Sequence, residues 1–213
     1  MKADHLRRGA AALLGAVGLA LLVQGLWIPI KAAAAQVLLE AAWARSLDGN
    51  TARPWPWADT WPVARLRAPD HGIDQIVLEG GTGNVLAFAP GRHGLSTPSR
   101  PVLGGHRDTH FSFLKDLSLG DELELESTDG RVTRYRASWA AVVDHRDLAI
   151  LEGDESSLVL VTCWPFDAMV PGGPLRYVVK AEPVPGSLEH VVETLAGQDA
   201  VRPALNVLGR RFG

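Results

Sequence analysis

A single cysteine stands among the 213 residues of this chain, at a position that favours a reactive thiol. Cys163 ends the apolar, partly β-branched run Leu158–Cys163, and Pro165 stops any strand two residues later. A side chain at a strand end beside a loop has a rigid support and is accessible to a substrate. Because one cysteine cannot form an intramolecular disulfide, Cys163 is either a small buried apolar group or a nucleophile.

A reactive thiol needs a base or a cation nearby, because the thiolate is the nucleophilic form and the pKa of free cysteine is about 8.5. His106 ends another apolar run, directly after two glycines. Arg176 opens a third, and its permanently charged guanidinium suits an oxyanion formed during acyl transfer. Taken singly, His106 fits a buried core histidine and Arg176 an ordinary ion pair. Together the three residues predict a site for cysteine-based acyl transfer.

Four separated segments of the chain resemble a known family. They are Pro54–Leu66, Gly105–Phe111 (Gly-His-Arg-Asp-Thr-His-Phe), Val161–Asp167 (Val-Thr-Cys-Trp-Pro-Phe-Asp) and Pro171–Val179 (Pro-Gly-Gly-Pro-Leu-Arg-Tyr-Val-Val). In this order they resemble the sortase family of cysteine transpeptidases, and in particular its class from Gram-negative bacteria, class GN. The resemblance covers roughly residues 54–183. It implies an all-β fold, a closed eight-stranded sortase-type barrel with short helical crossovers.

The same resemblance implies roles for the three residues. Cys163 would attack a backbone carbonyl in a C-terminal sorting signal of an exported protein and form a thioester. His106 would protonate the leaving amine and later deprotonate an incoming amine of unknown identity. Arg176 would hold the carbonyl oxygen as negative charge develops. Thr162 and Trp164, beside the nucleophile, are expected to contact substrate, although a plain strand or loop-packing role is an alternative for each.

No cofactor is expected, and no metal, because no acidic cluster resembles the calcium site of some Gram-positive sortases. Three alternatives stay open. A cysteine endopeptidase with water as acceptor would use the same residues. A zinc or iron site built from His106, Asp108, His110 and Cys163 is chemically feasible but leaves Arg176 unexplained. A catalytically silent envelope-binding domain would need none of them.

The elements that must position these residues are short. Apolar segments separated by Gly, Pro, Asp and Asn indicate strands, and eight of them suffice to close a small barrel. Short helical crossovers are expected at Thr109–Leu117 and Asp147–Glu152. The loops Gly91–Pro101 and Trp164–Pro174 are expected to border the substrate groove, with Leu95, Trp164, Phe166 and Met169 as apolar candidates. The predicted strands are Val63–Leu66, Ile73–Leu78, Val85–Ala89, Val102–His106, Glu122–Glu126, Val132–Val143, Leu158–Cys163 and Arg176–Ala181.

The N-terminal region indicates a membrane anchor. Residues 1–8 carry Lys2, Arg7 and Arg8, and the uncharged stretch 9–30 is long enough to cross a hydrocarbon core of about 30 Å. We expect a single-pass signal-anchor with its N-terminus in the cytoplasm and the catalytic domain on the periplasmic side of the inner membrane. A cleaved signal peptide is the alternative, because small residues follow at Ala32–Ala35.

The remainder divides into three parts. Residues 31–61 are expected to form a juxtamembrane helix and a Pro/Trp-rich linker, whose tryptophans cover a barrel end or rest at the membrane interface. Residues 62–185 would be the catalytic domain, and 186–213 a partly helical tail that begins near Ser187. The formal net charge of -3 gives no reason to expect nucleic acid as a partner.

Overall fold

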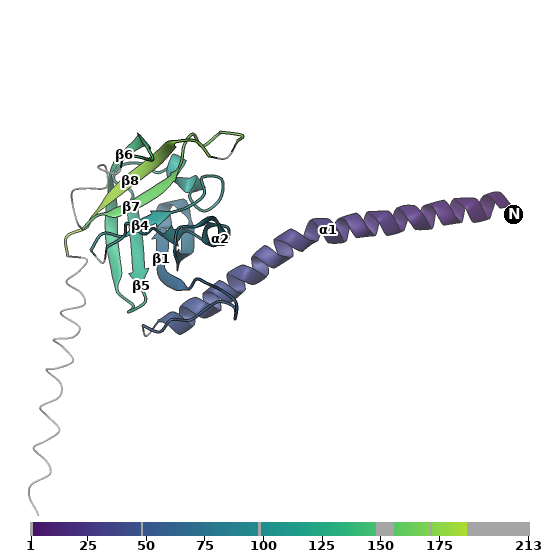
Figure 1. Cartoon of the computed structure of the whole chain (residues 1–213), viewed down its shortest axis with the longest axis horizontal. Helices are drawn as coiled ribbons and strands as arrows, with labels where there is room; N and C mark the ends of the chain where they lie inside the picture. The colour runs from purple at the N-terminus through teal and green to yellow at the C-terminus, as the bar shows by residue number, and fades with distance from the viewer. Residues whose placement is uncertain (1, 48, 98, 148–155, 171, 187–213) are drawn as a thin grey trace, which may run out of the picture.

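A computed structural model describes residues 2–47, 49–97, 99–147, 156–170 and 172–186. The helix α1 (Lys2–Ser46) extends far from the rest of the protein, and its last turns lie against a small barrel (Figure 1). Pro29 stands inside this helix, where it removes one backbone hydrogen bond. By length and composition, α1 contains an apolar stretch sufficient to cross a membrane.

The eight strands close into a barrel, as expected, in the order β1-β2-β3-β4-β7-β8-β6-β5. The pairs β2–β3 and β4–β7 are parallel, and the other neighbours are antiparallel. Three short helices, η1 (Pro69–His71), α2 (Gly83–Leu86) and η2 (Ser112–Lys115), lie between strands. The strands are β1 (Pro62–Ala68), β2 (Ile73–Glu79), β3 (Gly91–Arg92), β4 (Val102–Gly104), β5 (Glu122–Ser127), β6 (Val132–Asp144), β7 (Leu158–Cys163) and β8 (Leu175–Pro183).

One predicted strand is wrong. The segment Val85–Ala89 forms part of α2 and the turn after it, and the third strand is the two-residue β3. Val85 is buried against α1 and β2 rather than within a sheet, and a short apolar run does not distinguish these two kinds of burial. At Gly91 in β3, a β-carbon would lie 2.0 Å from the carbonyl oxygen of Gly80, so only glycine allows this pairing.

Two further differences concern boundaries. β4 ends at Gly104, two residues before His106, so the histidine lies on the loop that follows the strand. The crossover expected at Thr109–Leu117 contains the short helix η2. From residue 148 the expected crossover Asp147–Glu152 lies outside the described residues, as does the tail from 187.

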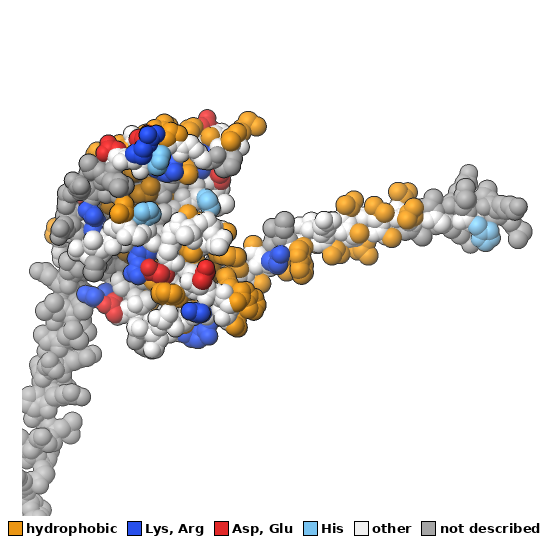
Figure 2. Space-filling model, in the orientation of Figure 1, with side chains coloured by type: hydrophobic (Ala, Val, Ile, Leu, Met, Phe, Trp, Pro, Cys, Tyr) orange, Lys and Arg blue, Asp and Glu red, His pale blue; other side chains and the backbone are white. Residues whose placement is uncertain are grey.

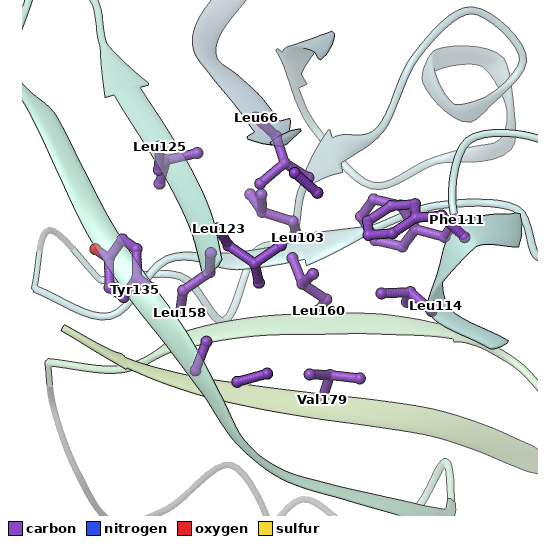
Figure 3. Close-up of a cluster of buried hydrophobic side chains, with 14 of the residues drawn as sticks. Leu66, Leu103, Phe111, Leu114, Leu123, Leu125, Tyr135, Leu158, Leu160 and Val179 are labelled. Carbon is purple, nitrogen blue, oxygen red and sulfur yellow. The ribbon is translucent and has the colours of Figure 1, made fainter. Parts of the chain in front are cut away.

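The barrel interior is filled by large apolar side chains from most of its strands. Leu103 of β4 and Leu158 and Leu160 of β7 point toward Leu66 and Leu123 from the opposite strands (Figure 3). In β5 the leucines alternate with glutamates in the sequence, and Leu123 and Leu125 both face this core. Each such leucine contributes roughly 1.5–3 kcal/mol through burial. The core therefore holds β4, β7 and β8 in a defined register.

The last turns of α1 are fixed to the outside of the barrel. Leu39 and Trp43 pack with Ile76 and Leu78 of β2 in a second apolar cluster. An ion pair between Glu40 and Arg65 of β1, at 3.0 Å, lies at the edge of this contact. The helix therefore meets the barrel through packed side chains, and the Pro/Trp-rich linker follows after Ser46.

Candidate active site

Cys163 and Arg176 are direct neighbours across two strands. In the antiparallel pair β7–β8 the register sets Cys163 opposite Arg176, at the end of β7 and near the start of β8. The pairing continues one residue further, where the Trp164 amide donates a hydrogen bond to the Leu175 carbonyl at 3.1 Å. Both side chains therefore sit on a well-paired part of the barrel.

His106 is brought to the other side of Cys163 by the parallel pair β4–β7. Gly104 is the register partner of Val161. One step on, the Thr162 hydroxyl donates a hydrogen bond to the Gly105 carbonyl at 2.7 Å, across a sequence separation of 57 residues. His106 and Cys163 are the residues that directly follow this contact, so the parallel pair brings the two chain segments that carry them side by side.

Cys163 and Arg176 lie on the outer face of the barrel wall, and His106 is exposed on the loop after β4. On β7, Leu158 and Leu160 face the core, so Val159, Val161 and Cys163 face outward. On β8, Val179 faces the core, so Val178 and Arg176 face outward as well. Cys163 is partly exposed and His106 is exposed. The thiol is thus accessible from outside rather than sealed in the interior.

At Gly105 the backbone approaches the core too closely for any side chain. A β-carbon there would lie 2.7 Å from the Phe111 ring, which is fully buried. Glycine at this position therefore lets the chain pass over Phe111 and deliver His106 to the surface of β7.

A hollow with a volume of about 260 Å³ lies on the same outer face. Val161 of β7 and Val178 of β8 contribute apolar wall, and Leu95, one of the predicted groove residues, contributes more. Arg176 lines the hollow too, so the guanidinium and the apolar wall share one surface. The remaining lining residues are His93, Val102, Val143, Asp144, His145 and Asp147.

The Arg176 guanidinium is held by its own loop. Its Nη1 donates to the carbonyl oxygens of Gly173, at 2.8 Å, and Leu175, at 2.9 Å. Nε and Nη2 make no hydrogen bond to any residue that the structure describes. One nitrogen therefore anchors the group, while the other two remain as donors for a developing negative charge.

The two predicted substrate contacts are engaged within the protein. Thr162 is buried, and its hydroxyl binds the Gly105 carbonyl, which ties the His106 loop to β7. The Trp164 ring stacks on Tyr177 at 5.8 Å and meets Phe166 edge-on at 5.6 Å. These contacts are the packing roles that the sequence left as alternatives, and contact with substrate stays a prediction for both residues.

Arg107 is a structural residue of the site that the sequence did not single out. It follows His106 directly and is only 4% exposed. Its Nη2 donates to the carbonyl oxygens of Ala168, at 2.8 Å, and Val170, at 3.0 Å, both in the loop between β7 and β8. Arg107 therefore connects the loop that carries His106 to the loop that joins Cys163 to Arg176. The sequence gives no signal for this role, because an arginine among polar residues is typical of an exposed loop.

Replacing Arg107 by alanine is expected to loosen the β7–β8 loop. Two hydrogen bonds from a charged donor would be lost, each contributing about 1.5–3 kcal/mol. We expect a lower melting temperature and faster limited proteolysis between Trp164 and Pro174. Arg131→Ala is the matched control, because Arg131 pairs with Asp129 on an exposed turn. Equal proteolysis of the Arg107→Ala and Arg131→Ala proteins would contradict the connection.

A second histidine, His110, lies on the loop after His106. Its backbone carbonyl accepts a hydrogen bond from Gln75 at 3.0 Å. Burial lowers the pKa of His110 below 6.5, and the charge of nearby His106 lowers this pKa further. His110 therefore favours its neutral form in the folded protein.

Replacing His110 by glutamine is expected to weaken the pH dependence of stability. Because the pKa of His110 is lower in the folded than in the unfolded protein, the unfolded chain binds the proton first as the pH falls. The free energy of unfolding should be highest above pH 6.5 and fall as the pH decreases toward the folded pKa. Thermal unfolding of both proteins across this range measures the effect, and parallel curves would argue against it.

The alternative metal site lacks convergent ligands. Among the described residues, no group of three or more His, Cys, Asp and Glu side chains is arranged to hold a metal ion. Asp108, one of the four candidates, is turned toward the Nε of Arg107 at 3.4 Å. The geometry gives no support to a site built on His106, Asp108, His110 and Cys163.

A family profile of the sortase domain matches residues 66–184, more than half of the chain. This chain belongs to the sortase family. It is also 35% identical over 112 residues to Sortase D of Bacillus subtilis (strain 168). That match covers 51% of this sortase and 53% of the relative, so the chain spans about half the length of the curated protein it matches.

Solved sortase structures share the fold. A Clostridium perfringens Sortase D5 transpeptidase superposes with a TM-score of 0.51 and 21% identity, over 68% of this chain and 88% of that one. Sortase A from Corynebacterium diphtheriae gives a TM-score of 0.53 and 20% identity, over 70% and 84% of the two chains. At these identities the likeness establishes the barrel fold and leaves substrate and partner undecided.

Proposed function

We propose that this sortase is a membrane-anchored cysteine transpeptidase of class GN. It cleaves a C-terminal sorting signal of an exported protein through a thioester on Cys163 and transfers the acyl group to an amine. The observation that supports this proposal is the strand pairing around β7, which sets Cys163 opposite Arg176 and brings the loop that carries His106 beside the end of β7. The class assignment is supported by the four sequence segments named above.

In the first half-reaction the Cys163 thiolate attacks the scissile carbonyl carbon and forms a C–S bond. The carbonyl electron pair moves to oxygen, and the two free nitrogens of Arg176 donate hydrogen bonds to the resulting oxyanion. When the oxyanion collapses, the C–N bond breaks and His106, as imidazolium, gives its proton to the leaving amine. The product is an acyl-thioester and a released C-terminal fragment.

In the second half-reaction the neutral His106 accepts a proton from the incoming amine as that amine attacks the thioester. A second oxyanion forms against Arg176, the C–S bond breaks, and the thiolate is regenerated. Water can replace the amine with the same proton transfers, which would make the protein an endopeptidase. The acceptor is thus decided by which nucleophile reaches the thioester.

The hollow beside Arg176 is the proposed binding place for the sorting signal. Its walls include Val161, Val178 and Leu95, which favour an apolar side chain on the substrate. Arg176 lies at the same surface, so a peptide bound there presents a backbone carbonyl near the guanidinium. Leu95 comes from the loop Gly91–Pro101.

The proposed location is the inner membrane, with the barrel on the periplasmic side. Support comes from the apolar, exposed part of α1 and from Lys2, Arg7 and Arg8 before it, which favour a cytoplasmic N-terminus. The lipid contact is then made by the N-terminal helix. An exported substrate with its own hydrophobic C-terminal segment would be held at the same membrane.

Trapping the acyl-enzyme tests this function. The full-length protein would be isolated from membranes under mildly acidic conditions, and Cys163 adducts identified by intact and peptide mass spectrometry. Hydroxylamine, a small amine nucleophile, should release the adduct as a hydroxamate, whereas water alone should release it slowly. If Cys163 stays unmodified in the presence of its exported substrate, the proposal is wrong. If water releases the adduct as fast as hydroxylamine does, the endopeptidase is favoured.

A further inference from the structure

The Pro/Trp-rich linker after α1 exposes a large aromatic side chain to solvent. Trp57 is 82% exposed, whereas Ala58 and Thr60 beside it are buried. Trp55 packs edge-on against Phe88 with ring centroids 5.1 Å apart. Only part of this segment covers the barrel, and the Trp57 ring contributes little buried area to it.

A second exposed apolar site lies at the tip of the β7–β8 loop. Met169 is 99% exposed and Val170 is 75% exposed. The loop is nonetheless held in place, because Arg107 binds the carbonyl oxygens on both sides of Met169. An apolar tip on a fixed loop is unfavourable in water and favourable against an apolar partner.

The linker that carries Trp57 follows the last turns of α1, where the helix meets the barrel (Figure 1). The β7–β8 loop extends toward the same side as the apolar part of α1 (Figure 1). Figure 2 shows hydrophobic side chains gathered on the barrel where the helix joins it, and again at a projecting tip on that side. Other exposed apolar side chains, such as Leu119 and Val132, lie elsewhere on the barrel, but Trp57 and Met169 are, together with Val170, the most exposed large apolar residues of the described part outside α1.

The helix fixes how far this side is from the bilayer. Lys31, at the end of the uncharged stretch, lies over the Trp27 ring at 5.2 Å, an arrangement suited to the membrane interface. Gln36, five residues later, donates a hydrogen bond to the Phe88 carbonyl at 2.9 Å. At a rise of 1.5 Å per residue, Gln36 lies about 7.5 Å beyond Lys31 along the helix axis. The headgroup layer is itself about 5–8 Å deep on each side of the hydrocarbon core.

We propose that Trp55, Trp57, Phe88, Met169 and Val170 form a membrane-facing surface that rests in the headgroup layer of the bilayer holding α1. Tryptophan is favoured at this depth because its ring is apolar and its N–H finds polar partners. The docked end of α1 holds the barrel at this height. This inference rests on the anchoring part of the proposed function.

Contact with the bilayer would place the acyl-transfer site next to the membrane surface. Met169 lies between the two carbonyl groups that Arg107 binds, and Arg107 follows His106. A sorting signal just outside a hydrophobic segment then reaches Cys163 without leaving the membrane surface. The membrane-facing surface thus favours substrates whose sorting signal lies close to the bilayer.

The lone cysteine makes a direct test possible. In full-length Cys163→Ala protein, the additional substitution Trp57→Cys or Met169→Cys supplies one site for a bimane fluorophore. The control is Val132→Cys, because Val132 is exposed and apolar on β6, which lies on the side of the barrel away from the anchor (Figure 1). Each labelled protein is reconstituted into phosphatidylcholine–phosphatidylglycerol vesicles, with or without lipid that carries a nitroxide on its headgroup.

We expect the labels at 57 and 169 to lose more than half of their fluorescence to the nitroxide lipid, and the label at 132 to lose little. If the protein floats with the vesicles but the label at position 57 or 169 is quenched no more than the label at 132, the membrane-facing surface is overturned and the anchor is left intact. Protein that fails to float with the vesicles would overturn the anchor, and the surface with it. Quenching at one of the two positions alone would also overturn the surface as defined.

Discussion

Replacing Cys163 by alanine is expected to abolish acyl-enzyme formation and to lower turnover by about 10⁴-fold or more, as the loss of a nucleophile does in other acyl-transfer enzymes. The thiol is partly exposed at the end of a well-paired strand, so its loss should leave the barrel folded. Intact mass spectrometry measures the thioester, and a peptide-cleavage assay measures turnover.

A labelling experiment provides the control for this result. Because the chain contains one cysteine, iodoacetamide should label the wild-type protein once and the Cys163→Ala protein not at all. Val132→Ala, on the outside of β6, should keep both the label and the activity. Residual acyl transfer by folded Cys163→Ala protein would assign the nucleophile to another group and reject the proposed mechanism.

Replacing Arg176 by lysine is expected to lower kcat by about 10²–10³-fold although the positive charge is retained. Arginine anchors Nη1 on the Gly173 and Leu175 carbonyls and still offers two more nitrogens to the oxyanion. A lysine ammonium has a single nitrogen, which cannot hold the loop and reach the oxyanion in the same geometry. The loss should appear mainly in kcat, because the hydrogen bond strengthens as negative charge develops.

Arg136→Lys is the matched control for this substitution. Arg136 is exposed on β6 and pairs with Glu122 at 2.8 Å, so exchanging it should leave kcat near the wild-type value. Wild-type kcat in the Arg176→Lys protein would show that charge alone suffices and would remove the argument from donor geometry. A large rise in KM at constant kcat would indicate that Arg176 binds the substrate rather than stabilising the oxyanion.

The regular strands were predictable because their alternation is local. Leu123 and Leu125 alternate with charged residues, and this pattern alone identifies β5 and its buried face. The apolar run that ends at Cys163 likewise identifies β7. The prediction of a strand at Val85–Ala89 was wrong because a short apolar run is compatible with any buried backbone. Here the segment is buried against α1 and forms a helical turn.

The candidate site was predictable in its residue types but not in its supports. Cys163, His106 and Arg176 were found by their chemistry and by their places beside apolar runs. The connection made by Arg107 was not, because a buried arginine between two surface residues looks like any charged loop residue in the sequence. Its partners are backbone carbonyls some sixty residues away, and such contacts leave no trace in residue type.

Residue type and spacing were therefore enough to predict a barrel of short strands, an apolar N-terminal helix and three candidate groups for acyl transfer, because each depends on local pattern and side-chain chemistry. The folded chain alone decided that β4 runs parallel to β7, which brings the His106 loop beside the end of β7, and that α1 docks on β2. These decisions depend on pairing and packing between distant segments. Their energies come from contacts across the barrel, which no stretch of the chain contains by itself.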